Sequence, residues 1–171
     1  MKGYTLIRTI RKNFVSVYGY TLIELLVSLT IIGILFSVSY VGFRDFSRRQ
    51  ALTGVVKQVQ GDLRLAQQDA LSGTKPSSGC NSLDGINFSI DSSTTYSIYY
   101  VCDGAVLPVP VKPTATLPPE ISISNDTNPI FFKGLGSGTN IPAGSQATIT
   151  VTQIQTGSQA NILVGSGGDV K

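Results

Sequence analysis

The stretch GYTLIELLVSLTIIGILFSVSYVGF, residues 19–43, decides the fold of this chain. Its last nineteen residues, 25–43, carry no charge. At a rise of about 1.5 Å per residue, such a helix nearly spans a hydrocarbon core of about 30 Å, and residues 20–23 extend it. A transmembrane helix is therefore predicted over residues 20–43. The alternative is a buried helix of a soluble protein, but such helices are seldom apolar on every face over this length.

Glu24 is the one acidic residue in this apolar stretch. A carboxylate costs about 2.5–3.5 kcal/mol at the centre of a bilayer and less toward an interface. If the chain is cut after Gly19, the new α-amino group of Tyr20 lies four residues before Glu24. The Tyr20 ammonium of one subunit would then neutralise the Glu24 carboxylate of its neighbour, in only one axial register. We therefore expect Glu24 to specify assembly and not to catalyse a reaction.

The segment before the apolar stretch is basic. It holds four of the thirteen basic residues: Lys2, Arg8, Arg11 and Lys12. Without residues 1–19 the chain keeps nine basic and ten acidic residues, so its charge is about −1, which argues against binding nucleic acid through bulk charge. The basic flank favours a cytoplasmic N-terminus, although three arginines follow the apolar stretch and weaken this rule. They are Arg44, Arg48 and Arg49.

The order of these features resembles the class III signal of type IV prepilins and of the pseudopilins of type II secretion. The resemblance rests on residues 19–27, GYTLIELLV, between a basic leader and an apolar helix. It implies cleavage between Gly19 and Tyr20 by a membrane aspartic prepilin peptidase, and N-methylation of Tyr20. It also implies a single-pass protein of the inner membrane, with its head in the periplasm or outside the cell. The implied partners are other pilin or pseudopilin subunits, an inner-membrane assembly platform and membrane lipid.

Residues 3–7, GYTLI, repeat residues 19–23 letter for letter. The first copy is followed by Arg8 and lacks the glutamate, so it cannot open a membrane helix. Gly19 is therefore the expected cleavage residue, and residues 1–19 are the expected leader peptide.

A second helical pattern follows the apolar stretch. Apolar residues recur at three- and four-residue steps, with polar residues between them: Leu52, Val55, Val56, Val59, Leu63, Ala66, Ala70 and Leu71. Because no proline occurs before Pro76 and Ser72-Gly73 is a plausible stop, one helix is predicted over residues 20–72, with an amphipathic part over 44–72. The alternative is a separate amphipathic helix after a bend.

Residues 73–171 are predicted to form a β-rich head. The strand candidates are residues 85–90, 95–102, 120–124, 129–133, 147–154 and 159–164. Hairpin turns are expected at residues 91–94 and 155–158. Residues 104–119 hold five of the eight prolines and are predicted to be an exposed loop. The fold class is thus α+β, with the long N-terminal helix packed on an antiparallel sheet.

The chain has two cysteines, Cys80 before the first predicted strand and Cys102 at the end of the second. A hairpin would bring them together, and in a head outside the cytoplasm they are expected to form a disulfide. Such a bond would close a loop of about 22 residues and contribute roughly 3 kcal/mol. Metal binding is the alternative, but two thiolates without any histidine make a poor site.

Catalysis is not expected. Without histidine, Ser-His-Asp and Cys-His chemistry is excluded. Asp84, Asp91 and Asp103 have no spacing that distinguishes them from solvated loop carboxylates. The glycine clusters at 134–138 and 165–168 do not form a phosphate-binding loop. No cofactor and no metal site are expected.

The head also resembles H-type pseudopilins and T-type minor pilins. The similar segments are residues 63–71, residues 130–136 and the C-terminal residues 162–170. This implies a minor subunit that initiates or caps a filament. Some T-type relatives bind DNA through a C-terminal segment rich in glycine and arginine, but residues 165–171, GSGGDVK, contain no arginine, so nucleic-acid binding is not expected.

Three alternatives stay open for the function. One is a filament-tip subunit for adhesion or DNA uptake. Another is a major pilin, which the lack of a proline in the membrane half of the helix disfavours. A third is a signal-anchored membrane protein that is never cut.

Overall fold

The computed structural model describes residues 19–171, apart from the side chains of residues 38–42. The chain divides into two compact units, Met1–Phe43 and Arg44–Lys171. One helix, α1, runs from Leu22 to Ser72 and contributes to both. The helix is thus continuous, and the alternative of a separate amphipathic helix after a break is not found in the described residues.

The end of α1 follows from its sequence. Gly73 adopts a positive φ of 67°, which glycine reaches without a steric penalty, and the Thr74 N–H donates to the Asp69 carbonyl at 3.1 Å. This left-handed residue ends the helix at the predicted stop.

The first unit consists, in its described part, of the start of α1. Large apolar side chains there are exposed, among them Leu29 at 60% and Ile34 at 66%. No helix in the described part of the chain is both long and apolar enough to cross a membrane. The membrane segment predicted over residues 20–43 includes residues 38–42, whose side chains are not described. The segment as a whole is therefore not tested, and it stays a prediction.

The second unit packs the later part of α1 against two antiparallel sheets. The first sheet has the order β3-β2-β1-β5. Its strands are β1 (Leu83–Ser92), β2 (Thr95–Cys102), β3 (Ala105–Thr116) and β5 (Ile130–Lys133). The second has the order β4-β6-β7. Its strands are β4 (Ile121–Asn125), β6 (Gln146–Gln153) and β7 (Gln159–Gly165), and a short 3-10 helix, η1 (Gly134–Gly136), follows β5.

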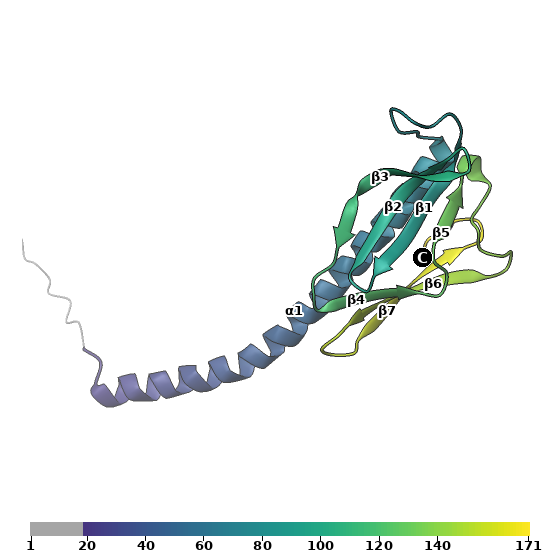
Figure 1. Ribbon diagram of the computed structural model, residues 1–171. Helices are drawn as coiled ribbons and strands as arrows, with labels where there is room; N and C mark the ends of the chain where they lie inside the picture. Colours follow the sequence, from purple (N-terminus) through teal and green to yellow (C-terminus); the bar gives the residue numbers. More distant parts are fainter. Residues whose placement is uncertain (1–18) are drawn as a thin grey trace, which may run out of the picture. The chain divides into compact units, whose positions relative to one another are not determined.

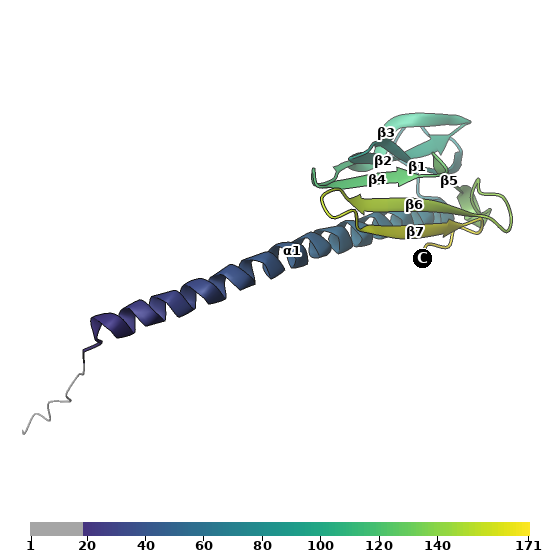
Figure 2. The same cartoon turned by 90° about the horizontal axis from the view of Figure 1, so that it is seen from below.

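The core lies between α1 and both sheets (Figure 1, Figure 2). The helix buries one side chain per turn along a single seam, formed by Leu52, Val55, Val59, Leu63, Ala66 and Ala70. Leu71 was expected on this seam but is 51% exposed, because it lies in the last turn, next to the Gly136 loop. The predicted α+β fold class is confirmed, with two sheets in place of one.

One predicted loop is wrong. Residues 105–116 form β3, the edge strand of the first sheet, in which Pro110 lies opposite Tyr99. An edge strand tolerates proline because one side of its backbone needs no N–H for a neighbouring strand. Three register shifts between β2 and β3 accommodate the irregular strand. Proline content alone therefore does not distinguish an exposed loop from an edge strand.

Candidate processing and assembly site

The predicted cleavage site lies at the start of the described chain. Gly19 and Tyr20 precede the helix and are exposed. A Cβ atom added to Gly19 would meet nothing within 4 Å. The fold therefore does not itself require glycine at this position, and any such requirement would come from a molecule that binds the segment. The rest of the predicted leader, residues 1–18, lies outside the described residues.

Thr21 caps the start of α1. Its Oγ1 accepts a hydrogen bond from the Glu24 N–H at 3.3 Å, and its carbonyl accepts one from the Leu25 N–H at 3.1 Å. This is one half of a capping box, in which a threonine precedes a glutamate by three residues. The T-x-x-E spacing is visible in the sequence and is the signal that could have predicted this cap. The cap places Glu24 in the first helical turn, where a negative charge also favours the helix.

Exposed apolar side chains surround Glu24 in the sequence. Each of these neighbours is more than half exposed: Leu22, Ile23, Leu25 and Leu26. Within residues 19–171, no salt bridge involves Glu24. The described part of the chain thus offers no cation to this carboxylate, which is the situation that a partner from another subunit would resolve.

The predicted cysteine pair is bonded in the head. Cys80 and Cys102 are joined by a disulfide with a Cα–Cα distance of 5.4 Å. Beside it, the Asp103 carboxylate accepts the N–H groups of Asn81 and Ser82, each at 3.1 Å. Asp84 accepts the Gly104 N–H at 2.6 Å. Both aspartates are exposed, but they also accept backbone N–H groups next to the disulfide, a role for which their spacing in the sequence gave no signal.

A partly buried polar cluster, formed by Gln58, Asp62, Tyr96 and Lys112, had no signal in the sequence. The Asp62 carboxylate accepts hydrogen bonds from the Tyr96 hydroxyl at 2.5 Å and from Lys112 Nζ at 2.7 and 2.8 Å. Gln58 Nε2 donates to the Tyr96 hydroxyl at 3.2 Å. The cluster ties α1 to β2 and to the edge strand β3. Sequence separations of 34 and 50 residues gave no local signal for it.

Tyr96 is fully buried. Burial raises the pKa of its hydroxyl, and the hydrogen bond to Asp62 and the charge of that carboxylate raise it further. A phenolate in this place would be desolvated and would face a carboxylate, so the hydroxyl stays protonated as a donor.

The described residues contain no group of three or more His, Cys, Asp or Glu side chains that could hold a metal ion.

The comparisons with known proteins bear on the N-terminal region. The family model described as "Prokaryotic N-terminal methylation motif" matches residues 16–40. A probable minor fimbrial protein from Dichelobacter nodosus is 35% identical over 71 residues, which are 40% of this chain and 44% of that protein. The match thus spans less than half of the relative's length. No solved structure gives a significant match.

These matches support a type IV pilin-like subunit that carries a class III signal. The motif implies a membrane-anchored prepilin that is processed by a prepilin peptidase and assembles with other pilins. The family model describes a methylation motif and the relative is named a fimbrial protein, and both agree with the prediction that the chain is not an enzyme.

Proposed function

We propose that this chain is a minor pilin or pseudopilin that helps to initiate or cap a type IV pilus-like or type II secretion filament. In this proposal the peptidase cuts between Gly19 and Tyr20, and Tyr20 is N-methylated. The first part of α1, residues 20–43, anchors the subunit in the membrane, and residues 73–171 form the exposed head. The observation that carries the proposal is Glu24, a carboxylate in the first helical turn, among exposed apolar side chains and without a salt bridge in the described residues.

The likeness to a minor fimbrial protein supports the minor role. A nucleic-acid function receives no support from the C-terminus. Its single base, Lys171, pairs with Asp169 at 3.1 Å, so this segment offers no net positive charge to a phosphate backbone.

Processing is tested by replacing Gly19. Since an added Cβ meets nothing there, Gly19→Val leaves the fold unchanged, and a loss of cleavage reports on the peptidase alone. We expect intact-mass measurement to find Tyr20, methylated, as the first residue of the wild-type chain and Met1 as that of the variant. Gly3→Val, in the duplicated GYTLI segment, is the matched control and should be cleaved normally. Cleavage of Gly19→Val at the same site would contradict the proposal.

Assembly is tested with Glu24→Ala. The substitution leaves the Thr21 cap in place, because the cap uses the backbone N–H of residue 24. We expect normal membrane insertion and normal cleavage, but at least a tenfold loss of the chain from sheared filaments. Glu120→Ala, in the head, is the control. Filament incorporation equal to wild type would remove the register role of Glu24.

A further inference from the structure

Gln153, the last residue of β6, carries a buried donor without an acceptor. Its side chain is 1% exposed, and its Nε2 has no hydrogen-bond partner in the described part of the chain. A buried polar group left unpaired costs free energy, so such a group in a folded protein calls for an explanation.

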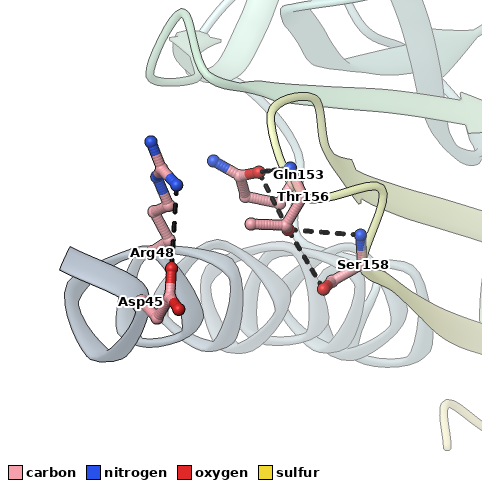
Figure 3. Close-up of polar contacts among 5 residues, drawn as sticks. All are labelled: Asp45, Arg48, Gln153, Thr156 and Ser158. Atoms are coloured by element: carbon pink, nitrogen blue, oxygen red, sulfur yellow. Dashed lines mark hydrogen bonds and ion pairs between the residues drawn. The ribbon is translucent and has the colours of Figure 1, made fainter. Parts of the chain in front are cut away.

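The amide cannot solve this by flipping. Gln153 Oε1 accepts from the Thr156 N–H at 2.7 Å and from its hydroxyl at 3.0 Å, as drawn in Figure 3. A flipped amide would set its own N–H groups against the Thr156 N–H, donor against donor. The turn between β6 and β7 therefore fixes Nε2 as the amide atom directed away from Thr156.

Arg48 adds a second donor group beside the first. Figure 3 shows the Gln153 amide nitrogen pointing toward the side on which the Arg48 guanidinium lies. The Arg48 side chain is only 25% exposed, yet its one ion pair within residues 19–171 is a long contact of 3.7 Å to Asp45, which is 62% exposed. A guanidinium has five N–H donors, so most of them have no acceptor among the described residues.

The charges around this pair are mostly positive. Arg44 and Arg49 lie on the same two turns of α1, against the single acid Asp45. The strand neighbour of Gln153 is Ile121, and Glu120 precedes it. Within the described residues, no hydrogen bond or ion pair joins the Glu120 carboxylate to Arg48 or Gln153. Apart from the long contact to Asp45, these donors therefore have no anionic acceptor among the described residues.

We propose that Arg48 and Gln153 bind the phosphate of an anionic phospholipid headgroup. The inference rests on the proposed membrane anchor, because Arg48 follows the apolar stretch by little more than one helical turn. Two exposed apolar side chains at this place, Phe46 at 59% and Ile154 at 56%, suit an interfacial position better than a purely aqueous one. Arginines at the surface of a membrane attract anionic lipid. The Nε2 of Gln153 is buried, so binding of the phosphate there requires a side-chain rearrangement at this site.

The test uses the full mature chain in vesicles of phosphatidylcholine, alone or with added phosphatidylglycerol, and measures backbone hydrogen exchange. With the anionic lipid, we expect exchange in residues 44–52 and 150–158 to slow about fivefold. Arg48→Gln should abolish this response. Gln153→Glu should abolish it too, because the new carboxylate oxygen would occupy the Nε2 position and pair with Arg48. Arg64→Gln changes an exposed arginine farther along α1 and should respond like wild type.

Three outcomes would overturn the proposal. The first is equal exchange in both kinds of vesicle. The second is equal slowing by inorganic phosphate over phosphatidylcholine, which would indicate a general anion site. The third is a slowing of hydrogen exchange that depends on the number of protein copies per vesicle and not on the charge of the lipid. This result would assign the site to a carboxylate of a second copy. A separate measurement asks whether the chain stays in the vesicle membrane during an alkaline carbonate wash. Release of the chain would count against the proposed anchor and not against the headgroup site.

Discussion

The two halves of α1 share a secondary structure but differ in where their apolar side chains are buried and where their polar side chains find partners. In residues 22–37, large apolar side chains are exposed around the helix, and the hydroxyls of Ser28, Thr30 and Ser37 donate to carbonyls of their own helix. In residues 44–72, apolar side chains form one buried seam, and polar ones such as Gln58 and Asp62 reach other elements. The first half satisfies its hydrogen bonds internally, as a helix in lipid must, and the second obtains its partners from the head.

This difference teaches where the partners of each half must come from. The seam of the second half is completed within the chain, so changes there affect folding of the head. The apolar surface of the first half is exposed in the single chain and would be covered by lipid or other subunits in the proposed filament, so changes there should affect assembly and leave the head stable.

The largest expected effect comes from a matched leucine pair. Leu63→Ala empties a fully buried position on the seam and should cost about 2–5 kcal/mol of unfolding free energy. Leu29→Ala, at a position that is 60% exposed, should change it by less than about 0.5 kcal/mol. Urea unfolding of the full chain in detergent, followed by tyrosine circular dichroism, measures both. Equal losses would mean that the head depends on the first half as well.

Next in size is the polar tie between the second half and β3. Lys112→Met leaves Asp62 buried beside Tyr96 without its cation and should cost about 1–3 kcal/mol. Lys57→Met, an exposed lysine on the same half, is the control and should be near neutral. A neutral result for Lys112→Met in the same urea experiment would show that the ion pair does not hold the edge strand to the helix.

Two helical glycines sharpen the comparison at a smaller scale. An added Cβ meets nothing within 4 Å at either Gly33 or Gly61. Gly61→Ala should therefore stabilise the head by up to about 1 kcal/mol through helix propensity alone. Gly33→Ala should leave the unfolding of the head unchanged while raising helicity in detergent. A stabilised head in the Gly33→Ala variant would contradict the division of roles.

The smallest expected effect is a loss of head stability at alkaline pH. Burial and Asp62 raise the pKa of Tyr96, so the unfolded chain loses this proton first. Head stability should accordingly fall as the pH rises above the ordinary tyrosine value of 10.0. Burial also raises the pKa of Tyr100, so Tyr96→Phe should weaken this fall without removing it. Unfolding measured between pH 8 and pH 11 checks the slope, and an unchanged slope in Tyr96→Phe would exclude Tyr96 as its source.

The sequence was sufficient wherever a local pattern carried the information. The three- and four-residue spacing predicted the seam from Leu52 to Ala70, and Gly73 predicted the end of α1. Cys80 and Cys102 could be paired because a hairpin connects their neighbourhoods. Glu24 stood out because it is a charge in an apolar stretch.

What the sequence missed depends on contacts between distant residues. The division into two sheets is set by which strands pair, and β5 joins β1 across the intervening β4. The prolines of residues 105–116 indicated a loop, but these residues form an edge strand because an irregular ladder with β2 accommodates the prolines. The Asp62–Lys112 pair and the donor at Gln153 exist only once α1, β3 and β6 are packed. Such sites have no spacing rule in the chain.

The prolines of β3 bear on whether the head aggregates through the open edge of its first sheet. Open sheet edges are templates on which other chains add strands and aggregate. Pro108, Pro110 and Pro113 deprive the β3 edge of three N–H donors, so a stray strand would find an interrupted ladder there. A head with this interrupted edge is less able to add strands from other copies along β3. In the proposed filament, association between copies would then depend on the helix.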